Sequence, residues 1–337
     1  MRNTEITEPV RLLDDQGFVE TPGFAKKYLW NYNRKNLKAS HIQMKEWDYY
    51  LVMCENFAAA FTISDLGYIR MGSVSFLDFE TNEDYTGTVL AHPSLRFKMP
   101  DEPDKGVSEI KSGPLHLRFE SGPNGKHVYC VFKKFHNNCD FKADVWFSDL
   151  PEESMNIAIP FEEKHRFYLN HKMNCMPCTG KVVFDWHVYR FDPKKDLGVM
   201  DWGRGLWPYK STWYWATAST MVKGKPFGFN LGCGFGDTSA ASENMLFYNG
   251  KAHKLDDVSF EIPEDPMQPW TITSSDGRFE GVFQPDLDRN ADINLGVVRS
   301  KQHQYFGRMN GTAILDSGSK IKMENIRCAI EVIENRY

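Results

Sequence analysis

The chain has 337 residues, of which 41% are hydrophobic and 14% aromatic, so it can bury the interior of two ordinary domains and is unlike a disordered or coiled-coil protein. Its net charge is −5 with acids and bases intermixed, and the missing basic stripe argues against a nucleic-acid surface. No apolar run approaches the length of a membrane helix, and the polar first residues lack the apolar core of a secretory signal. We therefore expect a cytoplasmic protein with reduced cysteines and no membrane span.

Strand patterns dominate the chain from its first third to its end. Apolar and polar residues alternate in short runs broken by Gly, Asn, Asp or Pro, as in AAAFTISD (58–65), HVYCVFKKF (127–135) and PFGFNLGCGF (226–235). Such runs are typical of antiparallel sandwiches and barrels. We expect few helices, and the best candidate for a short one is residues 24–28.

The two halves of the chain resemble each other. LWNY (29–32) precedes the aromatic strand pattern WDYYLV, and LWPY (206–209) precedes WYWATAS. We predict an all-β protein of two lipocalin-like antiparallel β-barrels packed together, with an N-terminal barrel over residues 1–155 and a C-terminal barrel over residues 156–337. Eight-stranded antiparallel barrels close their own edges and can hold one small ligand.

Four long motifs carry a resemblance to a known family: NHKMNCMP (170–177), MDWGRGLWPYKSTWYWA (200–216), GFNLGCGFGDTSAASENMLFYNGKAHKLDDV (228–258) and SSDGRFEGVFQPDLDR (274–289). Over nearly its whole length the chain resembles the bacterial family catalogued as "domain of unknown function 2804", which implies no established reaction. More weakly, the layout is similar to double-lipocalin proteins of the carotenoid hydratase type. That similarity implies a cavity, at or between the barrels, for a greasy substrate.

No metal or cofactor site is expected. GCGFG (232–236) precedes a turn and not a helix, which argues against a dinucleotide loop; its small residues let a strand bend or another group approach the backbone. Cys175 and Cys178 form a single CxxC, whereas a structural zinc site needs a second pair. Residues 286–294 lack the glycine and glutamate of an EF-hand loop.

Asp201 and Arg204 lie in DWGR, and if the segment turns at Gly203 their side chains meet. The favoured interpretation is a structural ion pair that closes a barrel end beneath Trp202; a reactive acid–base pair is the alternative.

Upstream, Asn170, Lys172 and Asn174 alternate and share one strand face. That face either lines a lumen that holds a polar group or faces solvent.

The segment GDTSAASEN follows a glycine-rich strand and is typical of a loop at a barrel rim. Asp237 and Glu243 in it are the candidates for a catalytic acid, because an apolar pocket keeps a carboxyl protonated; ordinary turn chemistry is the alternative.

In STWYWATAS, Trp213 and Trp215 face one side and Tyr214 the other, and Tyr214 is a candidate hydrogen-bond donor. The aromatic face is either a pocket wall or an interface between barrels. The expected binding residues are Trp207, Trp213, Trp215, Asn170, Lys172, Asn174, Asn230 and Asn244.

These features favour a cofactor-independent enzyme of hydratase, isomerase or cyclase type that acts on a hydrophobic or semi-polar small molecule in an aromatic-lined barrel cavity. The first alternative is a lipocalin-like small-molecule binding protein without catalysis. The second is a carbohydrate-active enzyme, which would need two carboxyl groups set across a cleft. The substrate and the oligomeric state are not defined by the sequence.

Overall fold

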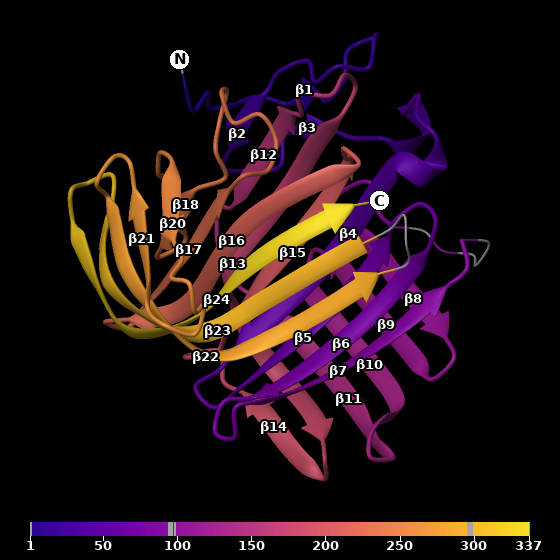
Figure 1. Ribbon diagram of the computed structural model, residues 1–337, viewed down its shortest axis with the longest axis vertical. Coiled ribbons are helices and arrows are strands. Elements are labelled where there is room, and N and C mark those ends of the chain that lie inside the picture. Colours follow the sequence, from indigo (N-terminus) through magenta and orange to yellow (C-terminus); the bar gives the residue numbers. More distant parts are fainter. Residues whose placement is uncertain (1, 94–96, 98, 295–298, 337) are drawn as a thin grey trace.

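The computed structural model describes residues 2–93, 97, 99–294 and 299–336. Two large antiparallel sheets, each strongly curled, make up most of the molecule, and they pack against each other (Figure 1). A small two-stranded sheet, β1 (Val10–Arg11) with β3 (Trp30–Asn31), lies near the N-terminus. The predicted all-β fold of two lipocalin-like barrels with few short helices is confirmed.

The first sheet runs in the order β7-β6-β5-β4-β15-β13-β11-β10-β9-β8, with β12 and β14 paired to β13 and β2 paired to β12. Its strands are β2 (Gly23–Ala25), β4 (Met44–Met53), β5 (Phe57–Asp65), β6 (Arg70–Asp78), β7 (Glu83–Ala91), β8 (Gly106–Ser112), β9 (Leu115–Gly122), β10 (Gly125–His136), β11 (Cys139–Phe147), β12 (Met155–Pro160), β13 (Phe167–Phe184), β14 (His187–Phe191) and β15 (Leu197–Leu206).

The second sheet runs in the order β19-β18-β17-β16-β24-β23-β22-β21-β20. Its strands are β16 (Lys210–Val222), β17 (Lys225–Cys233), β18 (Met245–Tyr248), β19 (Lys251–Lys254), β20 (Val258–Glu261), β21 (Trp270–Ser274), β22 (Phe279–Asn294), β23 (Arg299–Ile314) and β24 (Lys320–Arg336).

Both sheets follow one plan. The first long strand of each, β4 or β16, pairs with the last strand of the same sheet, β15 or β24. Each first strand also follows an LWxY segment, directly for β16 (Lys210–Val222) and after two short 3-10 turns for β4 (Met44–Met53). The chain passes from one sheet to the other at residues 207–209. The expected boundary between residues 155 and 156 falls within β12, inside the first sheet.

The helix expected at residues 24–28 does not form. Residues 23–25 are strand β2, because Gly23, Phe24 and Ala25 pair with β12, and the backbone of Phe24 also bonds Thr4 and Ile6. Sheet pairing therefore overrides local helix propensity here. The helices among the described residues are two single 3-10 turns, η1 (Arg34–Asn36) and η2 (His41–Gln43).

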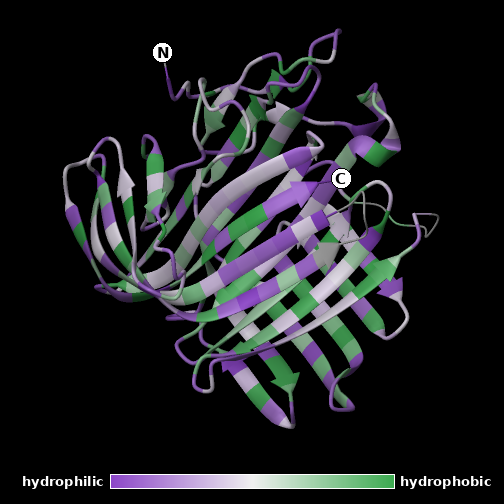
Figure 2. Cartoon of the chain, in the orientation of Figure 1, coloured by the Kyte–Doolittle hydropathy of each residue, from purple (hydrophilic) through white to green (hydrophobic). Residues whose placement is uncertain are grey.

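Each sheet curls around a core of its own, and a third apolar layer lies between the sheets. Figure 2 shows the hydropathy alternating along the strands, as expected where successive side chains point to opposite faces. On β4, for example, Tyr50 enters the first core, whereas Tyr49 and Leu51 enter the layer between the sheets. Trp215 and Ala329 meet them from the second sheet. Buried residues of β4, β13 and β15 therefore face buried residues of β16, β17 and β24.

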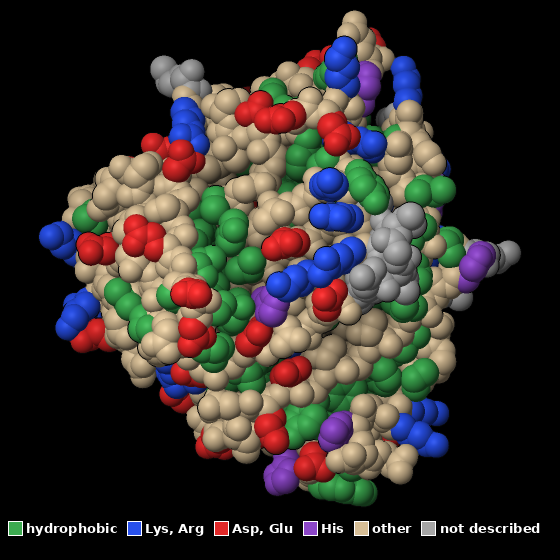
Figure 3. All heavy atoms as spheres, viewed as in Figure 1, with side chains coloured by type: hydrophobic (Ala, Val, Ile, Leu, Met, Phe, Trp, Pro, Cys, Tyr) green, Lys and Arg blue, Asp and Glu red, His purple; other side chains and the backbone are tan. Residues whose placement is uncertain are grey.

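Acidic and basic side chains are interspersed on the face shown in Figure 3. None of the described helices is long and apolar enough to span a membrane.

Candidate active site between the two sheets

Lys172 stands at the centre of a polar cluster in the layer between the sheets. It lies on β13 directly opposite Asp201 on β15, and its ammonium group donates to the Asp201 carboxylate. The same Nζ lies 3.7 Å from Glu243 Oε2 and 4.5 Å from the centre of the Trp215 ring. Asn170 Nδ2 donates to Asp201 Oδ1 at 2.6 Å. The alternation in NHKMNC thus brings an amide and an ammonium to one carboxylate.

Two glutamates flank Trp215. In the second sheet Trp215 is opposite Glu331 on β24 and opposite Gly232 on β17. Glu243 lies over Gly232, where a side-chain Cβ would overlap its carboxylate. Trp215 Nε1 donates to Asn230 Oδ1 at 2.6 Å, and Asn230 Nδ2 donates to the Glu243 carbonyl at 2.8 Å. The small residues of GCGFG therefore let a carboxylate approach the strand.

Burial and neighbouring charges shift the pKa values of three titratable groups in the cluster. Burial raises the pKa of Glu331 to about 7, although Arg289 and Lys172 favour its ionised form. Burial also raises the pKa of Glu243, against the effect of Lys172 and helped by Asp201. Burial disfavours the charged form of Lys172, but Asp201 and Glu243 outweigh it and raise its pKa. Burial in an apolar layer thus favours the protonated forms of Glu243 and Glu331 despite the nearby cations.

Aromatic rings form a wall beside the cluster. The Trp47 ring lies 4.9 Å from that of Trp207 and 6.2 Å from that of Tyr168. Trp213 and Phe235 continue the wall, at 5.5 and 4.8 Å from Trp207. Trp47 Nε1 donates to Asp201 Oδ1 at 3.2 Å, which joins the wall to the cluster. The Trp face of β16 therefore lies at the interface between the sheets and also borders polar groups there.

Some residues of the cluster and its aromatic wall are partly accessible to solvent. Trp47, Trp213, Glu243 and Glu331 are partly exposed, whereas Asp201 and Lys172 are buried. The arrangement can place a proton-donating carboxyl against a small molecule that lies on flat aromatic faces.

The structure brings most of the predicted site residues into this layer. Asn170, Lys172, Trp207, Trp213, Trp215, Asn230 and Glu243 meet here, and Asp201 joins them.

Four of the predicted catalytic and binding residues lie apart from the cluster. Asp237 is exposed, and its Oδ1 accepts from the backbone N–H of Ser239 at 2.9 Å in a local turn. Tyr214 points to the other face of β16, where its ring stacks on Phe260 at 6.0 Å. Asn174 links the two sheets, because its Nδ2 donates to three oxygen atoms of the second sheet: Thr217 Oγ1, Ala218 O and Phe229 O. Asn244 accepts from Gly232 N–H and donates to Asp256 O, so it fixes the loop before β18.

The expected ion pair between Asp201 and Arg204 does not form. The two residues are three apart on β15, and an odd separation sends strand side chains to opposite faces. Arg204 points into the first barrel, where it lies 2.9 Å from Asp48 Oδ1 and 3.6 Å from Glu46 Oε1. The carbon atom of its guanidinium group also lies 4.0 Å from the centre of the Trp202 ring.

Sequence reasoning missed Glu331, Gln304 and Tyr49. Gln304 Nε2 donates to Glu331 Oε1 at 2.5 Å and to Tyr49 OH at 3.3 Å. One signal was available for Glu331, because CAIEVI (328–333) places a lone carboxylate in an otherwise apolar run. Nothing in the local sequence marks Gln304 or Tyr49.

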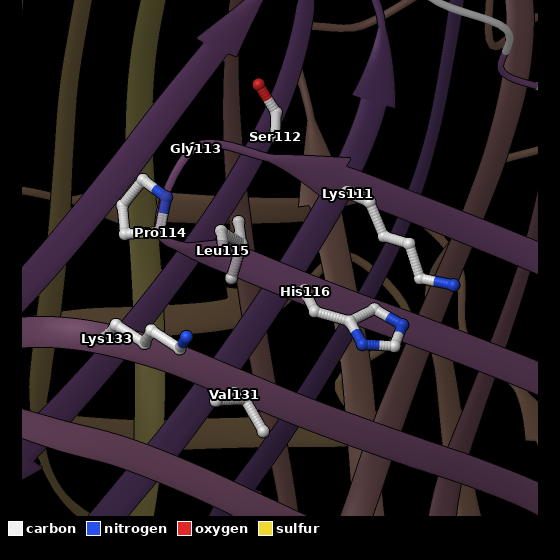
Figure 4. A pocket seen from close by; sticks show the side chains of 8 residues that line it. All are labelled: Lys111, Ser112, Gly113, Pro114, Leu115, His116, Val131 and Lys133. Atoms are coloured by element: carbon white, nitrogen blue, oxygen red, sulfur yellow. The ribbon is translucent and has the colours of Figure 1, made fainter.

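Two hollows lie away from this cluster. The first, of about 470 Å³, sits over the β8–β9 hairpin and neighbouring β10, and none of the predicted site residues lines it (Figure 4). The second, of about 450 Å³, lies at one end of the layer between the sheets and is lined by Met53, Ser219 and Arg327 among others. Each of these three residues lies on the same strand as a residue of the cluster, four positions away: Met53 from Tyr49, Ser219 from Trp215, and Arg327 from Glu331. Four residues of a strand span about 13 Å, which is the distance between this hollow and the cluster along the strands.

Gly232→Ala tests how tightly Glu243 is seated. The added methyl group would collide with the Glu243 carboxylate, so we expect the free energy of unfolding to fall by about 1–3 kcal/mol in a urea titration. Gly122→Ala is the matched control, because a Cβ there meets nothing within 4 Å, and it should change stability by less than about 0.5 kcal/mol. Equal effects of the two substitutions would contradict the placement of Glu243.

The architecture defines an all-β protein of two curled antiparallel barrels with a polar cluster between them. The chain belongs to the family described as "Domain of unknown function (DUF2804)", whose model matches residues 3–337. Comparison with curated proteins finds no match.

Solved structures with a similar arrangement include kievitone hydratase from Nectria haematococca, at 11% identity and TM-score 0.46, covering 87% of this chain and 88% of that one. A putative AttH from Nitrosomonas europaea matches at 11% identity and TM-score 0.49, over 89% and 95% of the two chains. CghA with Sch210972 matches at 10% identity and TM-score 0.45, over 96% and 97%.

Proposed function

We propose that the protein is a cofactor-independent enzyme of hydratase, isomerase or cyclase type, acting on a hydrophobic or semi-polar small molecule between the two sheets. The observation that carries the proposal is the buried polar cluster in which Asp201 and Glu243 flank the Lys172 ammonium and Glu331 lies opposite Trp215 on the neighbouring strand. A carboxyl group with a pKa near neutrality is suited to general acid catalysis at physiological pH.

The roles follow from the environment of each group. Glu331, with a pKa raised to about 7 by burial, donates a proton to a carbon–carbon double bond or a carbonyl of the substrate. The face of Trp47, which is partly exposed, stabilises the positive charge that develops. Asp201 and Lys172 neutralise each other and hold the geometry of the site.

In a hydration, the Glu331 proton forms a C–H bond at one alkene carbon and a water oxygen bonds the other. Glu243 takes the proton that this water releases. Proton exchange through solvent then returns both carboxyl groups to their starting states. An isomerisation uses the same first proton transfer and ends with loss of a different proton to Glu243.

Incubation of the purified protein with a hydrophobic metabolite extract in D2O tests the proposal. We expect deuterium in at least one carbon position of a product, and its loss in the double variant Glu243→Gln with Glu331→Gln. Asp237→Asn is the matched control, because Asp237 is exposed and outside the cluster, and it should leave turnover unchanged. A ligand that co-purifies intact and is never converted would instead establish a binding protein.

A further inference from the structure

A row of polar side chains crosses the inner face of the first barrel. Asn156 on β12, His171 on β13 and Trp202 on β15 lie opposite one another in turn across three neighbouring strands. All three are buried, with exposed fractions of 0, 1 and 2%. This face is the reverse of the one that carries Lys172 and Asp201, since alternate residues of a strand point to opposite sides. The row is therefore separate from the cluster between the sheets.

Tyr28 covers this row from the segment before β3. Its ring lies 5.5 Å from that of Trp202, edge to face, and 6.3 Å from that of His171. Four polar side chains thus meet inside one barrel. None of them takes part in the proposed chemistry between the sheets.

Each of these four side chains has at least one buried polar atom that lacks a hydrogen-bond partner among the described residues. The atoms are Asn156 Oδ1, both ring nitrogens of His171, Trp202 Nε1 and the Tyr28 hydroxyl. Buried polar atoms are nearly always hydrogen-bonded, because leaving them unpaired away from water is costly. A group of such atoms on adjacent strands indicates a place where a polar molecule binds.

The charged groups nearby are already paired within the barrel. Lys126 Nζ donates to Asp104 Oδ1 at 3.0 Å and to Pro103 O at 2.8 Å, and Arg204 holds Asp48. Burial lowers the pKa of His171 to about 4, so at neutral pH its ring is uncharged and offers one donor and one acceptor. A neutral ligand matches this environment better than an ion, because no charge in the row is left to balance one.

We propose that the first barrel contains an interior binding site for a small neutral molecule that carries amide or hydroxyl groups, formed by Tyr28, Asn156, His171 and Trp202. The indole N–H of Trp202 and one N–H of His171 donate to the oxygen of the ligand. Asn156 Oδ1 and the second nitrogen of His171 accept from its N–H or O–H. The Tyr28 hydroxyl can either donate a hydrogen bond to the ligand or accept one from it. A primary amide satisfies both sides at once, because its oxygen can accept two hydrogen bonds and its NH2 group can donate two.

Acetamide is the probe that tests this site, read by NMR of protein labelled with ¹⁵N at its tryptophans. The indole signal that disappears in Trp202→Phe identifies Trp202. We expect that signal to shift saturably with acetamide, and the dissociation constant to rise at least about tenfold in His171→Leu. Tyr28→Phe removes one hydroxyl and should give a smaller rise. Acetate, which has the same shape and a negative charge, should bind at least about tenfold more weakly.

Two controls separate this site from its alternatives. Trp186→Phe alters a tryptophan that is 90% exposed and should leave acetamide binding unchanged. Glu243→Gln alters the cluster between the sheets and should also leave it unchanged, so the result stands independently of the proposed function. The absence of a saturable shift, equal binding of acetate, or a crystal grown with acetamide that holds only water molecules along the row would each overturn the proposal.

Discussion

Replacement of Glu331 by Gln should lower turnover about 10²–10⁴-fold, the usual contribution of a general acid. The substitution keeps the size of the side chain and its contact with Gln304, and it removes the transferable proton. In the unmodified protein kcat/KM should fall as the pH rises above about 7, because Glu331 then ionises and can no longer donate. That limb of the pH profile should vanish in the variant.

The control for this substitution lies on the same strand. Glu334 is three residues further along β24 and exposed, so Glu334→Gln should leave both the rate and the pH profile unchanged. If Glu331→Gln kept the full rate, or kept the same alkaline limb, Glu331 would not be the acid.

The same carboxyl group links stability to pH. Its pKa rises from 4.5 to about 7 on folding, so between these values the folded protein binds more protons than the unfolded chain. Stability contributed by the protonated group is therefore lost as the pH rises through this window. At pH 8 Glu331→Gln should be more stable than the unmodified protein by up to about 3 kcal/mol, and at pH 4 the difference should vanish.

Much of the candidate site follows from strand periodicity alone. The alternation in NHKMNC places Asn170 and Lys172 on one face, and the alternation in STWYWATAS places Trp213 and Trp215 on one face. Both faces meet in the layer between the sheets. The small residues of GCGFG also behave as their composition predicts, since Glu243 approaches Gly232. These features are local, because side-chain direction in a strand depends only on residue parity.

What could not be predicted depends on contacts between distant segments. Glu331 joins the site because β24 pairs with β16, which places it opposite Trp215 across a long stretch of sequence. Asp237 and Glu243 are equivalent candidates in the sequence, yet a turn leaves Asp237 in solvent whereas Glu243 folds back over β17. Register and loop path are set by the whole sheet, and no local pattern encodes them.

The expected pairing of Arg204 with Asp201 was wrong for a related reason, because it depended on the path of the backbone at Gly203. A turn at Gly203 would have joined Asp201 to Arg204, but the segment continues as strand β15. Gly203 instead leaves room for the Trp47 ring, which a Cβ at that position would overlap. The DWGR motif thus serves two sites at once: Asp201 faces the cluster between the sheets, and Arg204 faces the interior of the first barrel.

Arg204→Met should cost about 3–5 kcal/mol of unfolding free energy, the largest stability effect that we expect for a single substitution in this protein. Arg204 is fully buried and donates to Asp48 and to the backbone oxygens of Trp47, Gly203 and Pro100. Methionine fills a similar volume but leaves Asp48 without its cation, while Glu46 keeps only Arg34 as a cationic partner. An uncompensated charge in a low-dielectric interior is the main reason for the loss.

The dependence of this loss on pH and on the partner residues separates lost charge pairing from lost packing. Burial already raises the pKa of Glu46, with Arg204 opposing, and removal of Arg204 should raise it further. The folded variant then takes up protons that the unfolded chain releases, so its deficit in stability should shrink as the pH falls toward 5. Adding Asp48→Asn and Glu46→Gln to Arg204→Met should recover part of the loss at neutral pH. A deficit that is independent of pH and unchanged in the triple variant would mean that Arg204 acts through packing on Trp202 and not through its charge.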